Sequence, residues 1–445
     1  MPLRNFVVIA LVALFSLACY SVASKNRFAN LFAEALDVID REALRDIPRR
    51  ELFDSAMNGM LSDLDEHSMY ISGDMFRAFD EDMKQEFGGV GMYVDNDPVN
   101  QRLVVLAPIP NTPAFKAGVQ SGDWIQEISG KSTEGLARGD AVKLMRGPTG
   151  EPVTVKIERD GNAWEEVLVR EVIPVPSLHG DWRTPSGTWK FTLKDDPKIA
   201  YLRLMQFGAM SVEEMEVALD EVAGEVDGLI LDLRNNSGGL LEAAIQISDM
   251  FLGEKKTIVS TRGRGGRLVE TVVSSVPPIF PIEKPVVVIV NRNSASASEI
   301  VAACLQDHGR AVVVGEQTWG KGTVQHVIPI ERGLSALKLT TSSYWRPSGK
   351  NIDRFGEGAV ESGVWGVNPE QEDRVELTEE ALFENARQRN RRDLQGLVGE
   401  GAAGEIEGGE VDKPHVDKPL QRSLELMKQE LGNKKTSRKQ TDFNL

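Results

Sequence analysis

The chain has 445 residues, of which 41% are hydrophobic and 27% are charged, and its formal net charge is −16 at pH 7. A chain of this length is too long for one compact core, so we expect two or three domains. The acidic balance argues against nucleic acid as a partner, because proteins that bind it carry basic patches or stripes.

The first 24 residues, MPLRNFVVIALVALFSLACYSVAS, have the form of an export signal. An apolar run from Phe6 to Ala18 follows a single arginine, and small residues come after it. The run is shorter than the roughly 20 residues of a membrane-spanning helix, so cleavage is our first interpretation and an uncleaved anchor the second. A lipoprotein site at Cys19 fits less well. We therefore expect an exported protein of the periplasm or cell envelope, with membrane association through the N-terminus as the alternative.

Residues 27–87 are predicted to be helical, since apolar residues recur at spacings of three and four. Residues 88–172 change to short strands, among them LVVLAPI, DWIQEI and EPVTVKIERDG, with brief helices at TPAFKAG and GDAVKLMRG. This pattern indicates a small mixed domain of the size of a binding module.

Residues 173–371 repeat the order of strand, glycine-rich turn and helix. The apolar strands DGLILDL, KPVVVIV and RAVVVGE alternate with the helices LLEAAIQISDMF and ASEIVAACLQDHG. Continuous apolar strands of this kind predict a buried, largely parallel sheet with helical layers. The fold class is therefore predicted to be α/β, in a chain of several domains.

Residues 372–445 form a charged extension. The stretch EDRVELTEEALFENARQRNRR is predicted to be a surface helix, and VGEGAAGEIEGGEVDKPHVDKP has too few apolar residues to fold. A last amphipathic stretch, LQRSLELMKQEL, precedes a basic tail. We expect this extension to be partly disordered and mostly solvated.

The serine-rich turn NRNSASASEI directly follows an apolar strand. Ser296 and Glu299 form the capping-box pattern, and most serines of this kind only cap a helix. A helix N-terminus also suits a nucleophile, because its free N–H groups and positive dipole stabilise an oxyanion. In LRNNSGG, Gly238 and Gly239 are candidates for a second oxyanion donor, with a tight strand-to-helix turn as the alternative.

A serine hydroxyl needs a base to take its proton. His326 is the best placed of the five histidines, but no clear partner carboxylate accompanies it. Lys321, between two glycines in WGKGTV, is the other candidate, provided that burial among neighbours such as Trp319 and Val324 lowers its pKa. In an extended segment Gln325 shares a face with Lys321 and can hold its amine. The alternative is that Lys321 is an ordinary solvated loop lysine. We favour Lys321 as the base only because it occurs together with the serine-rich turn.

Together these segments resemble the carboxy-terminal processing peptidases, also called tail-specific proteases, over residues 28–371. FGGVGMYV, NTPAFKAGVQSGDWIQEISGK and LMRGPTGEPVTVKIERDG resemble the PDZ domain of the family. DGLILDLRNNSGGLLEAAIQISDMF resembles its glycine turn, and SASASEIVAACLQDHGRAVVVGEQTWGKGTVQ resembles its catalytic core. LKLTTSSYWRPSGKNID, followed by GVNPE, resembles its C-terminal core motif.

The resemblance implies a Ser-Lys dyad in which Ser296 is the nucleophile, Lys321 is the neutral base and Gln325 orients the lysine. It also matches Ala297 and Gly238 to the backbone oxyanion donors. The fold it implies is an α/β peptidase core over residues 173–371, resembling the crotonase and Clp-protease type, beside a PDZ domain over residues 88–172.

Four further positions follow from the same resemblance. Gly239 is the less favoured alternative as an oxyanion donor. Asp307 matches an aspartate sometimes named with the dyad, although its place in LQDHG favours a helix-end salt bridge. The core departs from the family pattern at Trp319, where Phe is common, and Glu66 stands where the family often has Pro.

By resemblance, Gly89, Val90, Gly91 and Met92 present N–H groups to the terminal carboxylate of a peptide, which adds as a strand beside them. The implied activity is that of a serine endopeptidase that cleaves proteins near their C-termini and needs no metal or organic cofactor. Its implied partners are proteins with accessible C-terminal tails and an activating adaptor, and the oligomeric state is left open. A non-proteolytic PDZ scaffold with a latent protease domain is the alternative, and a hydrolase of non-peptide acyl groups is a third hypothesis.

Overall fold

The computed structural model describes residues 5–6, 9–16, 27–97, 100–184, 187–356, 359–395 and 416–442. Its contacts divide the chain into unit 1, Met1–Phe76 with Gln325–Thr340, and unit 2, Arg77–Val324 with Thr341–Leu445. The end of the predicted export signal and most of the predicted disordered segment lie outside the described residues. Within the described ranges, no helix has the length and apolar character needed to cross a membrane.

Unit 1 contains the predicted N-terminal helices. They are α2 (Arg27–Glu42) and α3 (Arg49–Ser62), and α4 (Gly73–Lys84) begins in this unit. A short strand, β1 (Met69–Ile71), occupies the break between the helices. It pairs antiparallel with β20 (Ser335–Trp345), which also pairs with β19 (Thr323–Ile330).

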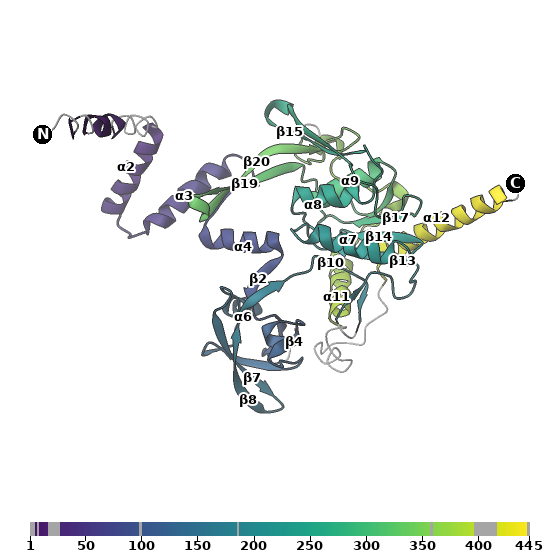
Figure 1. The fold of residues 1–445 in the computed structure, drawn as a ribbon, viewed down its shortest axis with the longest axis horizontal. Helices are drawn as coiled ribbons and strands as arrows, with labels where there is room; N and C mark the ends of the chain where they lie inside the picture. The colour runs from purple at the N-terminus through teal and green to yellow at the C-terminus, as the bar shows by residue number, and fades with distance from the viewer. Residues whose placement is uncertain are drawn as a thin grey trace. The chain divides into compact units, whose positions relative to one another are not determined.

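The predicted small domain is a six-stranded sheet with two short helices, and it belongs to unit 2 (Figure 1). Its helices are α5 (Pro113–Lys116) and α6 (Arg138–Met145). Its strands are β3 (Met92–Asn96), β4 (Leu103–Pro108), β5 (Trp124–Ile128), β6 (Lys131–Ser132), β7 (Pro152–Arg159) and β8 (Asn162–Val169). The strand order β3-β4-β5-β7-β8 places β3 at an edge of the sheet. The chain enters and leaves the domain through the antiparallel pair β2 (Glu86–Gly89) and β9 (Glu171–Pro174).

The predicted parallel sheet is confirmed. Its strand order is β10-β13-β14-β17-β18, and only β10 runs antiparallel to its neighbour. The strands are β10 (Leu178–His179), β13 (Ile199–Leu204), β14 (Gly228–Asp232), β17 (Val286–Val290) and β18 (Ala311–Gly315). Every residue of β13, β14 and β17 is buried, which explains why these strands are continuous apolar runs in the sequence.

Helices cover both faces of this sheet. Three helices pack on one face in the largest apolar cluster, namely α7 (Ser211–Val222), α8 (Leu241–Asp249) and α9 (Ala297–Asp307). The alternate sheet residues form a second cluster with Met427 of α12 (Lys418–Asp442), so this helix lies on the other face (Figure 1). The chain also forms α11 (Glu379–Gln395) before α12.

The expectation of a mostly solvated extension is wrong for the start of α12. Met427 is fully buried, and Leu420, Leu424 and Leu431 are partly buried against the same cluster. Their spacing places them on one side of the helix. The second face of the sheet is apolar, and this stripe covers part of it.

The remaining elements frame these layers. β15 pairs antiparallel with both β16 and β20. The remaining strands and short helices are β11 (Trp182–Arg183), β12 (Trp189–Lys190), β15 (Thr257–Arg262), η1 (Arg264–Gly266), β16 (Leu268–Val273), η2 (Glu331–Gly333), α10 (Ala359–Ser362) and η3 (Gln371–Asp373).

Candidate active site

The carboxyl ends of β14, β17 and β18 lead into glycine- or serine-rich turns, and the structure brings these turns together. The Ala295 N–H donates to Asn236 O at 3.1 Å, and the Ser294 hydroxyl donates to Leu233 O at 2.8 Å. On the other side, the Trp319 N–H donates to Ser294 O at 3.0 Å. The serine turn therefore contacts both the glycine turn and the lysine turn, at the edge where sites form in parallel sheets.

Ser296 stands at the N-terminus of α9 with a strained backbone. Its φ of 54° and ψ of −114° lie where residues with a side chain are rarely found, and the residue is 6% exposed. Strain of this kind costs of order 1–3 kcal/mol and concentrates at functional sites. A strained serine on a sharp strand-to-helix turn is also how α/β-hydrolases present a nucleophile. The hydroxyls of Ser294 and Ser298, in contrast, donate to backbone oxygens of the glycine turn and its preceding residue.

Glu299 is a completely buried carboxylate that joins the serine turn to the lysine turn. Its Oε2 accepts the N–H groups of Ser296 and Lys321, each at 2.8 Å. Its Oε1 accepts the Gly320 N–H at 2.7 Å and the Thr318 hydroxyl at 2.5 Å. Burial raises the pKa of Glu299 to about 6, against the opposing effect of these hydrogen bonds. The carboxylate therefore fixes the backbone of the candidate base relative to that of the candidate nucleophile.

Gly238 approaches Ser296 so closely that only glycine fits. A Cβ on Gly238 would lie 2.8 Å from Ser296 Cβ and 3.0 Å from Ala297 N, and its φ is 105°. Asn236 holds this turn, because its Oδ1 accepts the Gly238 N–H at 2.9 Å. The predicted donor thus lies beside the nucleophile, with its N–H already in a side-chain hydrogen bond. Its role as an oxyanion donor, together with that of Ala297, stays a prediction.

Lys321 is half-buried, and Glu299 fixes its backbone. Of the two predicted apolar neighbours, Val324 is 4% exposed. Trp319 is 42% exposed, and its ring lies against Arg354, whose Cζ is 4.1 Å from the ring centre. Trp319 therefore offers less cover than we expect from its size, and Lys321 as the base stays a prediction.

The other two predicted dyad partners have their own contacts. Gln325 belongs to unit 1, where its amide donates to the Thr340 hydroxyl at 3.2 Å, and its role in orienting Lys321 stays a prediction. Asp307 ends α9 and pairs with Arg346 at 2.5 Å. Although burial opposes it, this pairing holds the pKa of Asp307 below its usual range. The length of α9, about 16 Å at about 1.5 Å per residue, separates Asp307 from the nucleophile and favours the salt-bridge role.

The two histidines in the described part of unit 2 serve structural contacts. His308 follows the last residue of α9, and its Nε2 lies 2.7 Å from Thr257 O. His179 stacks on Trp189, with ring centres 4.7 Å apart, and burial lowers its pKa. Searched over the described ranges, the chain has no group of three or more His, Cys, Asp or Glu side chains that could hold a metal ion. His326, the best placed histidine in the sequence, lies on β19 in unit 1 and is exposed. Lys321 remains the candidate base.

Tyr344 contacts the candidate nucleophile, and the residue pattern did not predict it. Its hydroxyl interacts electrostatically with the Ser296 side chain, and its backbone N–H donates to Gly322 O at 2.7 Å. Burial raises the pKa of the Tyr344 hydroxyl to about 12, so it stays protonated at neutral pH. Its segment, SSYWRPSGKNID, carries a family resemblance, but no spacing rule places it beside a serine 48 residues earlier in the chain (344 − 296).

The predicted carboxylate loop, Gly89 to Met92, connects β2 to β3. At Gly91, with a φ of 75°, a Cβ would lie 2.2 Å from Thr112 Cβ, and the Thr112 hydroxyl donates to Gly91 O at 2.8 Å. Since β3 is an edge strand, one of its sides has no strand partner among the described strands. Addition of a peptide as a strand needs such an edge. Binding by Gly89, Val90, Gly91 and Met92 stays a prediction.

Comparison with known proteins agrees with this architecture. The family described as Peptidase family S41 matches residues 198–360, and the PDZ domain family matches residues 104–159. A carboxy-terminal-processing protease of Bartonella bacilliformis is 41% identical over 315 residues, which cover 69% of this chain and 68% of that protein. Carboxy-terminal processing protease CtpA of Bacillus subtilis is 32% identical over 309 residues, covering 69% of this chain and 62% of that protein.

Among solved structures, the photosystem II D1 C-terminal processing protease aligns with 86% of this chain and 100% of its own, at 25% identity and a TM-score of 0.45. The Bartonella relative alone, at 41% identity over 68% of its length, is close enough to show the family. The chain belongs to peptidase family S41, as one of its carboxy-terminal processing proteases.

Proposed function

We propose that Ser296 and Lys321 form the catalytic dyad of a serine endopeptidase that cleaves proteins near their C-termini. The observation that carries this proposal is the strained backbone of Ser296 at the start of α9, tied through Glu299 to the backbone of Lys321. Family membership supports the reaction class, and the names of the relatives support cleavage at C-terminal tails.

In this mechanism Ser296 Oγ attacks the scissile carbonyl carbon while the neutral Lys321 amine takes the hydroxyl proton. The N–H groups of Ala297 and Gly238 are assigned to the oxyanion of the tetrahedral intermediate. The Gly238 N–H must share or exchange its hydrogen bond with Asn236 Oδ1 to reach the oxyanion. Lys321 then donates its proton to the leaving amine, which leaves an acyl-enzyme. The lysine next removes a proton from water, which attacks the ester carbonyl. The ester bond to Ser296 Oγ then breaks, the lysine returns the proton to Oγ, and the new C-terminus is released. Gln325 is assigned to orient the lysine amine, and Asp307 is assigned to the Arg346 salt bridge.

The PDZ domain is assigned to capture substrate tails. A terminal carboxylate would bind the loop from Gly89 to Met92, and the tail would extend as a strand beside β3. The proposed substrates are therefore proteins with accessible C-terminal tails. We place them in the cell envelope because the first 24 residues have the form of an export signal, and fractionation of cells, with and without this segment, tests that placement.

The dyad is tested with the chain from residue 25 onward and with its Ser296→Ala and Lys321→Ala variants. Proteins with apolar C-terminal tails are incubated with each form, and the products are identified by mass spectrometry. We expect cleavage by the wild type and a loss of at least about 1,000-fold in both variants, since a nucleophile and its base act as a unit. Ser248→Ala is the matched control, because the Ser248 hydroxyl donates to Ala244 O within α8, and it should retain cleavage.

Equal cleavage by the wild type and Ser296→Ala would refute the mechanism. Tight binding of tails without cleavage by any form would instead favour the non-proteolytic scaffold.

A further inference from the structure

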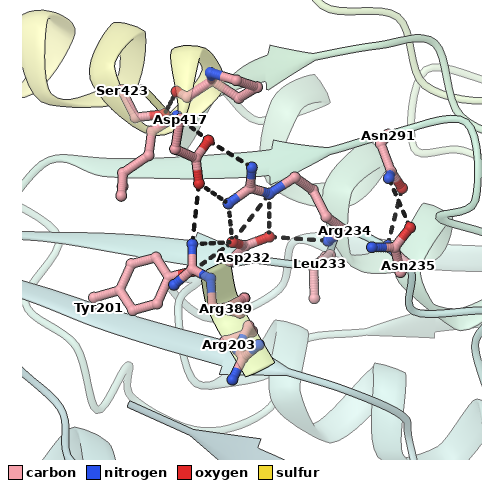
Figure 2. A network of polar contacts seen from close by, with 12 residues as sticks. Tyr201, Arg203, Asp232, Leu233, Arg234, Asn235, Asn291, Arg389, Asp417 and Ser423 are labelled. Carbon is pink, nitrogen blue, oxygen red and sulfur yellow. Dashed lines mark hydrogen bonds and ion pairs between the residues drawn. The ribbon is translucent and has the colours of Figure 1, made fainter. Parts of the chain in front are cut away.

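A buried cluster of charges adjoins the candidate oxyanion turn. Asp232 ends β14, Arg234 begins the turn, Arg389 lies on α11, and Asp417 directly precedes α12 (Figure 2). Arg234 lies 2.6 Å from Asp232 and 2.8 Å from Asp417. Arg389 lies 3.1 Å from Asp417 and 3.9 Å from Asp232. We call these four residues the charge quartet.

The charge quartet is balanced and nearly excluded from water. Its two carboxylates face two guanidinium groups, and the most exposed of the four side chains, that of Asp417, is 14% exposed. Although burial opposes them, the guanidinium charges hold the pKa values of Asp232 and Asp417 below their usual range. The Tyr201 hydroxyl also donates to Asp232 at 2.5 Å. Loss of one carboxylate would therefore leave an excess buried positive charge, which a protein interior tolerates poorly.

The quartet is continuous with the turn that carries the predicted oxyanion donor. After Arg234, the Asn235 N–H donates to Asn291 Oδ1 and the Asn291 amide donates back to Asn235 Oδ1, both at 2.9 Å (Figure 2). The next residue, Asn236, accepts the Gly238 N–H at 2.9 Å. A displacement of Arg234 would thus act on a donor only four residues away, through a chain of fixed side chains.

Half of the quartet comes from the C-terminal extension. Arg389 and Asp417 follow the segment that matches peptidase family S41, which ends at residue 360. We propose that this extension positions the oxyanion turn, with Arg389 and Asp417 holding Arg234 in the place that catalysis needs. Both are positioning residues, since neither belongs to the dyad or donates to the oxyanion. The inference rests on the proposed function and gives the extension a role in it.

The test compares two aspartate-to-asparagine variants of the full chain. Asp417→Asn removes one quartet charge but keeps a side chain that can cap α12, because Asp417 Oδ1 accepts the Leu420 N–H at 3.3 Å and asparagine caps equally well. Asp373→Asn is the matched control. It breaks the partly buried pair between Asp373 and Arg422 of α12, which are 2.8 Å apart and do not belong to the quartet.

Two quantities are measured for each folded variant: hydrogen exchange of the backbone amides of residues 233–239, by mass spectrometry, and steady-state cleavage kinetics. For Asp417→Asn we expect exchange at least about tenfold faster in this turn. We also expect kcat to fall by between about 10- and 100-fold while KM stays within about twofold, as for weakened oxyanion stabilisation. Asp373→Asn should change neither the exchange of the turn nor kcat.

The inference is overturned if the turn exchanges alike in Asp417→Asn and the wild type, or if Asp373→Asn accelerates it equally. It is also overturned if KM rises at constant kcat. If Asp417→Asn does not fold, Arg389→Lys makes the same comparison, because it keeps the charge and loses the forked geometry. Failure of the proposed function gives a different result: the wild type would then cleave no substrate. Hydrogen exchange needs no substrate, so it would still decide whether the extension holds the turn.

Discussion

Replacing Glu299 with glutamine should change how the stability of the protein depends on pH. Glu299 is completely buried, and burial raises its pKa from 4.5 to about 6 in the folded chain. The folded state therefore binds the proton more tightly than the unfolded state does. The stability that comes from this group is full below pH 4.5, falls as the pH rises to about 6, and is constant above that value.

The magnitude follows from the size of the shift. A rise from 4.5 to about 6 is about 1.5 pKa units, and each unit corresponds to about 1.36 kcal/mol, so the wild type loses about 2 kcal/mol across this range. Glu299→Gln does not titrate. The variant starts from a lower stability, because one of the two oxygens that accept hydrogen bonds is lost. Its free energy of unfolding relative to the wild type should nevertheless rise by about 2 kcal/mol between about pH 4 and about pH 7.

Urea unfolding, followed by tryptophan fluorescence at a series of pH values, measures this difference. Glu316→Gln is the matched control, because Arg292 holds the pKa of Glu316 below its usual value of 4.5 despite burial. The stability from Glu316 is present above pH 4.5 and is lost as the pH falls below it. The free energy of unfolding of Glu316→Gln relative to the wild type should therefore fall with rising pH, where that of Glu299→Gln rises. A Glu299→Gln difference that is independent of pH, or that follows the Glu316→Gln curve, would contradict the raised pKa of Glu299.

Three further predictions concern the same core. Tyr344→Phe removes the hydroxyl that interacts with Ser296 and should lower kcat about fivefold at constant KM, since a polar contact of this kind contributes about 1 kcal/mol; an unchanged kcat would contradict this. Gly239→Ala places a Cβ 2.1 Å from a backbone oxygen at a φ of 145°, so we expect a loss of more than about 2 kcal/mol in urea unfolding. Gly224→Ala, whose Cβ meets nothing within 4 Å, should be nearly neutral, and equal effects would count against the steric argument. Burial raises the pKa of the Cys304 thiol to about 12, so iodoacetamide should label Cys304 only after unfolding, and labelling of the peptide that contains Cys304 in the folded protein would contradict its burial.

The sheet could be predicted from the sequence because its strands are buried on both faces and are therefore continuous apolar runs. The packing of α12 could not be predicted in the same way. The spacing of Leu420, Leu424 and Met427 predicts an amphipathic helix, but it does not say which surface the apolar side covers. That surface is the second face of the sheet, formed by strands more than 100 residues earlier in the chain. A local pattern cannot specify such a distant partner, so the extension was expected to be solvated.

The candidate site could be predicted only in part, because local patterns identify its turns but not the contacts between them. Ser296 and Lys321 lie in turns at strand ends, and both turns are recognisable from local composition. Their connection through Glu299 depends on contacts across 19 to 22 residues, and the pair between Arg234 and Asp417 spans 183 residues. The strain at Ser296 likewise follows from the surroundings of the turn and not from its residue types. These features can be recognised only in the folded structure.

The most direct test of the account is to identify the residue that becomes acylated. The wild type and Ser296→Ala are mixed with a peptide ester, quenched in acid after a few milliseconds, digested and analysed by mass spectrometry. We expect an acyl group on the wild-type peptide that contains Ser296, and no acylated peptide from Ser296→Ala. Acylation of a different residue, or of Ser296→Ala to the same extent, would contradict the assignment of Ser296 as the nucleophile.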